Sequence, residues 1–206
     1  RFVDIAGLVA GASKGEGLGN KFLSHIRETD AIAEVVRCFE DENITHVSGS
    51  VDPLRDIDII NTELCLADLE TTQKRADRLN KIAKSGDKAA KAELAVLEKV
   101  LACLENGEGA RKAQLTKDEL PLLKELNLLT LKPILYICNV AEDEAATATE
   151  NPLVQKVTEF AAAEGSQVVA VSAKIESEIA ELPDDEAAMF LEELGLPEAG
   201  LTKLIH

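Results

Sequence analysis

The sequence predicts an α/β fold in which a parallel sheet is interrupted by an inserted helical hairpin. Short apolar runs typical of buried strands alternate with helical patterns at both ends of the chain, as they do in parallel sheets. Between about residues 52 and 130 these runs stop, and apolar side chains recur at three- and four-residue steps. Aromatic residues make up 3% of the chain and Trp is absent, which favours helices packed on parallel strands over an aromatic-rich sandwich. We therefore predict a sheet part at 1–51, a helical hairpin domain at 52–130 and a second sheet part at 131–206.

The first sheet part opens with a strand followed by a loop dense in glycine. Residues 2–8 form an apolar, β-like run that ends in Asp-x-x-Gly, and five of the twelve glycines lie at positions 7, 11, 15, 17 and 19. Glycine lets a backbone approach a phosphate closely and lets a loop take two conformations. A buried strand that delivers an aspartate to such a loop is what a phosphate-sensing switch needs. A short helix at 21–28 and a buried strand at 31–39 follow.

Two amphipathic helices joined by a tight turn form the predicted hairpin. Asp52-Pro53 marks the helix entry, because proline is tolerated in the first turn. Gly86 suits the left-handed position that ends the first helix. The apolar stripes of the two helices comprise Ile57, Ile60, Leu64, Cys65, Leu69, Ala76, Leu79 and Ile82, then Leu94, Leu97, Leu101 and Leu104. Narrow stripes and a short connection predict an antiparallel pair. A third, short helix is predicted at 116–126, with Thr116 as its N-cap and Glu119 three residues later.

Strand character returns after the hairpin. Residues 133–140 and 166–171 are predicted to be buried strands. They alternate with a helix at 151–164, which has Pro152 in its first turn. Two acidic helices follow, at 176–182 and 184–194.

Charge and cysteine content limit the classes of function. The 22 basic and 38 acidic residues give a net charge of −16, which repels phosphate backbones, so we expect no direct nucleic-acid binding by this segment unless a local basic patch exists. The four cysteines are far apart in sequence, and Cys38 and Cys138 lie in strand-like runs and are predicted to be small buried apolar residues. No apolar run approaches the ~20 residues that span a bilayer, so we expect no membrane partner and a cytoplasmic location.

Three loops follow the carboxyl ends of three predicted strands, at the edge where open α/β sheets bind ligands. They are Asp4-Ile5-Ala6-Gly7, Asn139-Val140-Ala141-Glu142 and Ser172-Ala173-Lys174. Each is common by itself, and Asn139 or Glu142 alone is equally a turn residue or a surface acid. Their order resembles that of P-loop GTPases: a metal-water aspartate, a base-reading loop, and a Ser-Ala loop behind the base.

Longer motifs narrow the resemblance. DIAGLVAGASKGEGLGNKFLSHIRETDAI, VVRCFEDENITHVSGSVDPLRDIDIINTEL, the inserted hairpin and the NVAE loop together resemble the YchF/Obg-like ATPase family across the whole chain. The resemblance implies a Ras-like P-loop NTPase sheet, hydrolysis of ATP or GTP with Mg²⁺, and a ribosome-associated role in translation or stress responses. In that family a phosphate-binding loop and switch I precede the matching region and a TGS domain follows it, whereas this sequence contains no G-x-x-x-x-G-K-[ST] motif. We therefore expect the 206-residue chain itself to be inactive.

The resemblance also assigns roles to residues. It implies that Asp4 holds Mg²⁺ through water, that Gly7, with Ala6 in the same loop, faces the γ-phosphate, and that Ser172-Ala173 backs the base. Asn139 would hydrogen-bond the purine edge, with Val140 beside it. Guanine readers carry Asn-Lys-x-Asp, but Val140 and Glu142 stand in place of that motif's lysine and aspartate, so either a relaxed specificity or a preference for ATP is implied.

The residue that follows Asp-x-x-Gly is a second difference between this sequence and standard GTPases. Leu8 stands where a water-orienting glutamine usually follows Asp-x-x-Gly, and leucine cannot hydrogen-bond water. The resemblance points to His46 as the catalytic residue, and its pKa range suits that role. A loop histidine that only packs under the helical domain is the alternative. His25 reads as a surface or partly buried helix residue. Lys14 and Lys174 are lone cations near the predicted site, and Lys14 reads as a solvated loop lysine rather than a phosphate contact.

Two alternatives to a hydrolase stay open. The nucleotide site could serve a non-catalytic sensor, and the hairpin with its charged outer faces could serve as a helical protein-interaction module. Nucleotide binding without turnover would distinguish the first from an enzyme.

Overall fold

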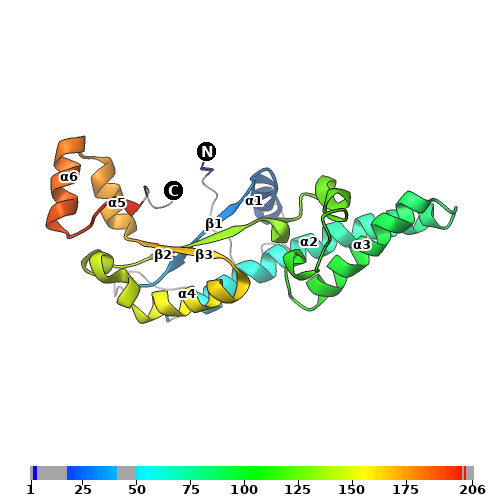
Figure 1. Ribbon diagram of the computed structural model, residues 1–206, viewed down its shortest axis with the longest axis horizontal. Helices are drawn as coiled ribbons and strands as arrows, with labels where there is room; N and C mark the ends of the chain where they lie inside the picture. The colour runs from blue at the N-terminus through cyan, green and yellow to red at the C-terminus, as the bar shows by residue number, and fades with distance from the viewer. Residues whose placement is uncertain (1, 4–17, 41–49, 201, 203–206) are drawn as a thin grey trace. The chain divides into compact units, whose positions relative to one another are not determined.

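The computed structural model of the protein describes residues 2–3, 18–40, 50–200 and 202. The chain divides into two compact units, one of residues 1–32 with 58–133 and one of residues 33–57 with 134–206. The helices of the described ranges are α1 (Leu18–Arg27), α2 (Pro53–Ala83), α3 (Lys88–Glu105), α4 (Pro152–Glu164), α5 (Ala173–Ala180) and α6 (Asp184–Glu193) (Figure 1). The 3₁₀ helices are η2 (Ala110–Lys112), η3 (Leu120–Leu126), η4 (Leu129–Leu131) and η5 (Glu142–Glu150), and the strands are β1 (Ile32–Arg37), β2 (Ile134–Asn139) and β3 (Gln167–Val171).

The three strands form one sheet in the order β1-β2-β3, which confirms the α/β class. β2 and β3 are parallel. β1 runs the same way as β2, because Ile32 N donates to Pro133 O at 3.0 Å and Cys38 N to Asn139 O at 2.8 Å. All three strands therefore end at the same edge.

Helix α4 covers part of the sheet within its own unit. Its Val154, Val157 and Ala161 are buried, and Phe160 meets the ring of the buried Tyr136 edge-on with centroids 5.9 Å apart. Asn151 begins the helix by accepting from Leu153 N at 2.8 Å. Proline at the next position fits this start, since the first-turn amide has no helical acceptor.

The expected burial of the first two strands is wrong in part. Side chains alternate across β1, so Val36 and Cys38 are buried while Val35 is 66% exposed. Only one face of β1 is covered. Phe2 and Val3, predicted to begin a buried strand, lie outside any strand with 65% and 47% of their surfaces exposed. A strand needs a paired neighbour to satisfy its backbone, and the described sheet begins at β1.

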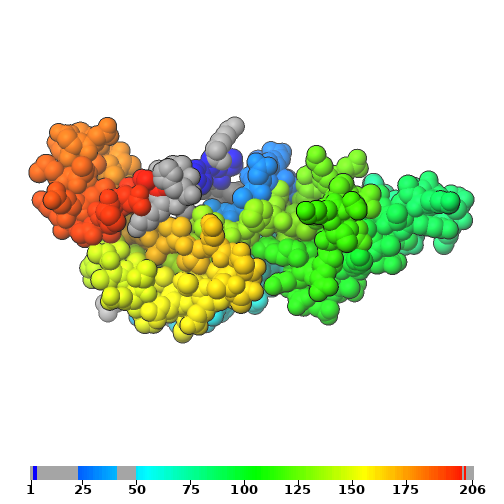
Figure 2. All heavy atoms as spheres, viewed as in Figure 1, coloured from blue at the N-terminus to red at the C-terminus, as the bar shows by residue number. Residues whose placement is uncertain are grey.

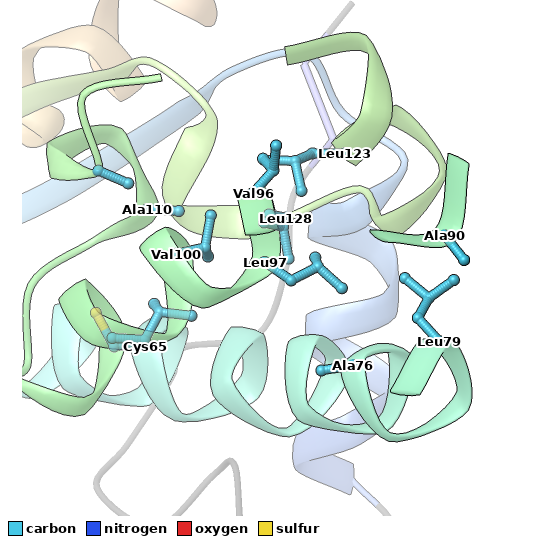
Figure 3. Close-up of a cluster of buried hydrophobic side chains, with 12 residues drawn as sticks. Cys65, Ala76, Leu79, Ala90, Val96, Leu97, Val100, Ala110, Leu123 and Leu128 are labelled. Carbon is cyan, nitrogen blue, oxygen red and sulfur yellow. The ribbon is translucent and has the colours of Figure 1, made fainter. Parts of the chain in front are cut away.

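The helical hairpin follows the prediction closely. Gly86 adopts φ +94° at the turn, and Asp87 Oδ1 caps α3 by accepting from Ala90 N at 2.9 Å. The buried side chains of α2 and α3 meet those of the following segment in one core (Figure 3): Cys65, Ala76, Leu79, Ala90, Val96, Leu97, Val100, Leu104, Ala110, Ala113, Leu123 and Leu128. Ile82, assigned to the stripe from its spacing, is instead 48% exposed.

The predicted third helix is shorter and tighter than expected. Thr116 and Glu119 exchange the reciprocal bonds of a capping box, Thr116 N to Glu119 Oε2 at 2.9 Å and Glu119 N to Thr116 Oγ1 at 3.3 Å. The chain then forms the 3₁₀ helix η3, because Pro121 has no N–H to continue an α-helical ladder.

A buried polar joint ties α1, α2 and η4 together within the helical unit. Asp68 is fully buried on α2 and accepts from Leu129 N at 2.9 Å, Thr130 N at 2.8 Å and Thr130 Oγ1 at 2.7 Å. Arg27, the last residue of α1, approaches the same carboxylate to 3.6 Å and also donates to Thr71 Oγ1 at 3.0 Å. A core of Leu23, Ile26, Leu64, Ala67 and Leu129 surrounds the joint.

A further prediction concerns the cysteines. Cys38 and Cys138 are both fully buried, as expected, and all four cysteines are free thiols. Among the described helices, none is long and apolar enough to cross a membrane.

Candidate functional site

The loops that follow β2 and β3 begin side by side. Asn139, the last residue of β2, is in register with Val171, the last residue of β3. Parallel strands end at one edge, so the register places the NVAE loop next to Ser172-Ala173-Lys174. Val140 N donates to Val171 O at 2.9 Å and its side chain is 2% exposed, which extends the pairing one residue beyond β2.

The side chain of Asn139 links the two loops directly. Its Oδ1 accepts from the backbone N–H of Ala173 at 2.9 Å. Ala173 is the first residue of α5, where amides lack acceptors inside the helix. Only the oxygen of a carboxamide can accept, so this bond fixes the orientation of the amide and leaves Nδ2 as its donor.

Ser172 directly precedes Ala173, the donor of this hydrogen bond. The residue is 3% exposed, and its Oγ makes no hydrogen bond to the residues that the structure describes. It stands at the N-cap of α5 without capping the helix through its side chain. The helix begins three residues earlier than the sequence predicts, directly after Ser172, so the Ser-Ala loop and the helix start coincide.

Glu142 and Lys174 form an ion pair across the two loops. Lys174 Nζ donates to Glu142 Oε2, and this hydrogen bond raises the pKa of the Lys174 ammonium. The side chains are 68% exposed for Lys174 and 35% for Glu142. The expectation that Lys174 is a lone cation is therefore wrong. Position in sequence alone did not reveal the pair, because the two residues lie 32 positions apart and meet only through the register of β2 and β3.

Asn151 holds the segment that follows β2 in place through its side chain, a role that the sequence did not indicate. Its Nδ2 donates to Glu144 Oε2 at 2.9 Å and to Cys38 O at 3.1 Å. The same residue caps α4. It thus fastens η5, which begins at Glu142, to the end of β1.

The remaining predicted site residues lie outside the described ranges. They are Asp4, Ala6, Gly7 and His46, together with Leu8 and Lys14. His25 is described and is exposed on α1. Within the described ranges, no group of three or more His, Cys, Asp or Glu side chains could hold a metal ion.

Two surface hollows of the described residues lie away from this sheet edge. An open hollow of about 450 Å³ lies on the hairpin beside Leu66 and Leu69. A second, of about 290 Å³, lies between α4 and β3 beside Val154 and Val168. Neither is lined by a predicted site residue.

Comparison with known proteins gives a consistent result. The chain is 57% identical over 204 residues to a ribosome-binding ATPase YchF from Bacillus subtilis, covering 99% of this chain and 56% of that protein. It is 59% identical over 205 residues to the protein of the same name from Haemophilus influenzae, covering all of this chain and 56% of that protein. The chain thus spans about half the length of the curated relatives it matches. No family model matches the chain.

The fold is similar to that of a solved protein. The structure of the YchF GTPase from Schizosaccharomyces pombe matches with a TM-score of 0.80 and 34% identity, covering 95% of this chain and 54% of that one. High identity along the whole chain and a shared α/β fold with a parallel sheet place this chain in the YchF family.

Proposed function

We propose that the whole protein containing this chain binds and hydrolyses ATP, accepts GTP less well, and associates with the ribosome. The relatives above carry the name ribosome-binding ATPase, and the solved neighbour carries the name GTPase. A cytoplasmic location and a role in translation or stress responses follow from this proposal.

The observation that carries the proposal is the bond between Asn139 Oδ1 and Ala173 N. It holds two loops together at the edge where α/β sheets bind ligands. It also turns Asn139 Nδ2 into a fixed donor, suited to the N7 acceptor that every purine presents. The buried Ser172 Oγ beside it is a further polar group available to a ligand.

The pairing of Glu142 supports ATP over GTP as the substrate. Guanine presents two hydrogen-bond donors, its N1–H and its 2-amino group, and a carboxylate must accept from both. Here Lys174 already donates to Glu142, so guanine would compete with the ion pair. Adenine lacks the 2-amino group and leaves the pair intact.

The chemical step is proposed from residues outside the described ranges. Leu8 cannot orient water, so we assign that role to His46, acting as a hydrogen-bonding or general-base group. Mg²⁺, which would neutralise phosphate charge, is assigned to Asp4 with Ala6 and Gly7 beside it.

Steady-state hydrolysis and equilibrium binding, measured on the whole protein, test this proposal. We expect turnover of ATP with a higher kcat/KM than of GTP. His46→Ala should abolish turnover and leave ATP binding unchanged, with His25→Ala as the matched control because His25 is exposed on α1. Binding without turnover in the unmodified protein would instead indicate a nucleotide sensor. Unchanged turnover in His46→Ala would remove that residue from the site.

A further inference from the structure

The segment that carries Glu142 has little of its own to hold it in place. It is η5 (Glu142–Glu150), a 3₁₀ helix of nine residues, whereas this type of helix usually spans about three or four. Thr147 interrupts it with non-helical angles of φ −115° and ψ 24°. Of these nine described residues only Ala148 is buried, and η5 lies at the surface of its unit (yellow-green in Figure 2). Apolar packing therefore does little to fix the position of Glu142.

Both ends of this segment are attached to Cys38, the residue that follows β1. At the start of the segment, Cys38 N donates to Asn139 O at 2.8 Å. At its end, Asn151 Nδ2 donates to Cys38 O at 3.1 Å. Cys38 is fully buried, so water cannot take the place of either partner. The chain from Asn139 to Asn151 is thus a loop closed on Cys38, and the side chain of Asn151 makes the closing bond.

The carboxamide of Asn151 uses all of its hydrogen-bonding capacity. Besides Cys38 O, Nδ2 donates to Glu144 Oε2 in η5 at 2.9 Å. Oδ1 accepts from Leu153 N at 2.8 Å and from Val154 N at 3.3 Å, at the start of α4. A carboxamide has two donor hydrogens and two acceptor lone pairs, so each of them has a partner here. These bonds hold the side chain in one orientation, and η5 is attached to it through Glu144.

The attachment of Glu144 also restrains Glu142. Glu144 N donates to Ala141 O at 3.2 Å, which closes the turn that contains Glu142. The ion pair between Glu142 and Lys174 is partly exposed, and pairs of this kind do little to hold a backbone in place. The bond between Glu144 and Asn151 is therefore the firmer restraint on the backbone beside Lys174.

We propose that Asn151 is a positioning residue that sets the choice between adenine and guanine. Its bonds to Cys38 O and Glu144 keep Glu142 in the ion pair with Lys174, so the carboxylate is not free to accept from guanine. Without the donor of Asn151, Glu142 can leave the pair and accept from the N1–H and 2-amino group of guanine. The inference rests on the nucleotide binding proposed above and adds a residue that itself contacts no base.

Asn139 is held by bonds that do not involve Asn151. Its backbone oxygen accepts from Cys38 N at 2.8 Å, and its Oδ1 accepts from Ala173 N at 2.9 Å. The donor that Asn139 offers to a purine therefore stays in place when the donor of Asn151 is removed. Removal should change the selectivity between purines more than the turnover of ATP.

Steady-state kinetics of the whole protein with ATP and GTP test the inference. Asn151→Asp keeps the oxygen that caps α4 but has no donor for Cys38 O or Glu144. We expect the ratio of kcat/KM for GTP to that for ATP to rise about three- to tenfold, with kcat for ATP within about twofold. Adding Glu144→Gln supplies an amide that can donate to the new carboxylate, and should reverse part of this rise.

A second variant leaves the helix cap untouched. Glu144→Ala removes one of the two bonds of Asn151 Nδ2 and keeps the bond to Cys38 O, so the same ratio should rise by about twofold. This variant decides the question if Asn151→Asp does not fold. An unchanged ratio in Glu144→Ala and in every folded Asn151 variant would overturn the inference.

Combination with Lys174→Gln shows whether Asn151 acts through Glu142. Both changes release the same carboxylate, so the double variant should have about the ratio of the more affected single variant. A merely structural role of Asn151 predicts that the two effects multiply. Multiplication would therefore overturn the inference.

Asn106→Asp is the matched control. It makes the same substitution in the other compact unit and removes a bond of the same kind, from Asn106 Nδ2 to Ala102 O at 2.9 Å. The ratio should stay within about twofold of that of the unmodified protein. An equal rise in the control and in Asn151→Asp would overturn the inference. If the unmodified protein binds nucleotide without turnover, the proposed hydrolysis fails, and the same comparison is decided by the Kd values for ATP and GTP; absence of binding would overturn both.

Discussion

The carboxamide of Asn139 uses its oxygen inside the protein and presents its nitrogen at the sheet edge. The oxygen accepts from Ala173 N at 2.9 Å, at a helix start that would otherwise leave this amide unpaired. One side chain therefore joins two loops and orients a donor toward the proposed base site. Its position at the end of β2 makes both tasks possible.

Lys174→Gln is expected to shift base selectivity toward guanine. Loss of the ammonium frees Glu142 to accept from guanine, and because the pair is exposed its loss should disturb the fold little. We expect the ratio of kcat/KM for GTP to that for ATP to rise about two- to fivefold in the whole protein. Lys156→Gln, an exposed charge removal on α4, is the control. An unchanged or lower ratio would count against the role given to the pair.

Gly200→Ala is expected to disturb the end of β3. A Cβ at this position would lie 2.9 Å from Val171 Cβ and closer still to Val171 Cγ1, while Gly200 N donates to Glu176 Oε1 at 2.7 Å. Overpacking of this kind costs about 1–3 kcal/mol, to be measured by urea unfolding of the chain. In the Val171→Ala background the cost should fall, because Cγ1, the nearest clashing atom, is gone and only the contact with the residue 171 Cβ is left. Equal costs in both backgrounds would show that Val171 is not the obstacle.

At the scale of elements, Asp68 determines how α2 is joined to η4 and α1. Its carboxylate accepts three hydrogen bonds from Leu129 and Thr130 and faces Arg27. The side chain is fully buried, so water cannot replace a lost partner. The joint therefore fixes the start of the hairpin more firmly than apolar contact alone.

Asp68→Asn is expected to destabilise the chain by about 2–4 kcal/mol, since an amide nitrogen would face donors and leave Arg27 without its counter-charge. Urea unfolding checks this value. Asp77→Asn makes the same change at an exposed site of the same helix and should stay within about 0.5 kcal/mol. Similar values for the two variants would contradict the importance of the joint.

At the scale of the whole molecule, the positions of β1, β2 and β3 along the chain and the two helices of the hairpin could be predicted, because both depend on local periodicity. The partners of long, flexible side chains could not. Lys174 and Glu142 meet only through the register of β2 and β3, and Asn151 reaches Cys38 O across 113 positions. Exposure was also hard to predict, since Ile82 has the spacing of a core residue and is nevertheless 48% exposed.

The site was predictable to a similar degree. The expectation that Asn139 and Ser172-Ala173 follow neighbouring strands needed only the strand pattern. The hydrogen bond between Asn139 and Ala173 depends on α5 starting three residues earlier than its apolar pattern indicates. The roles of Asp4, Ala6, Gly7 and His46 stay predictions, because these residues lie outside the described ranges.

The central claim is that Asn139 reads a purine from the edge of the sheet. Isothermal titration of the whole protein with ATP, comparing the unmodified protein with Asn139→Asp, tests it most directly. Aspartate keeps an acceptor for Ala173 N and lacks the donor that would reach the base, so the fold should persist while the Kd for ATP rises about tenfold or more. Asn80→Asp, the same change at an exposed hairpin position, should leave the Kd as it is. Equal ATP affinity for Asn139→Asp and the unmodified protein, with equal thermal stability, would contradict the account.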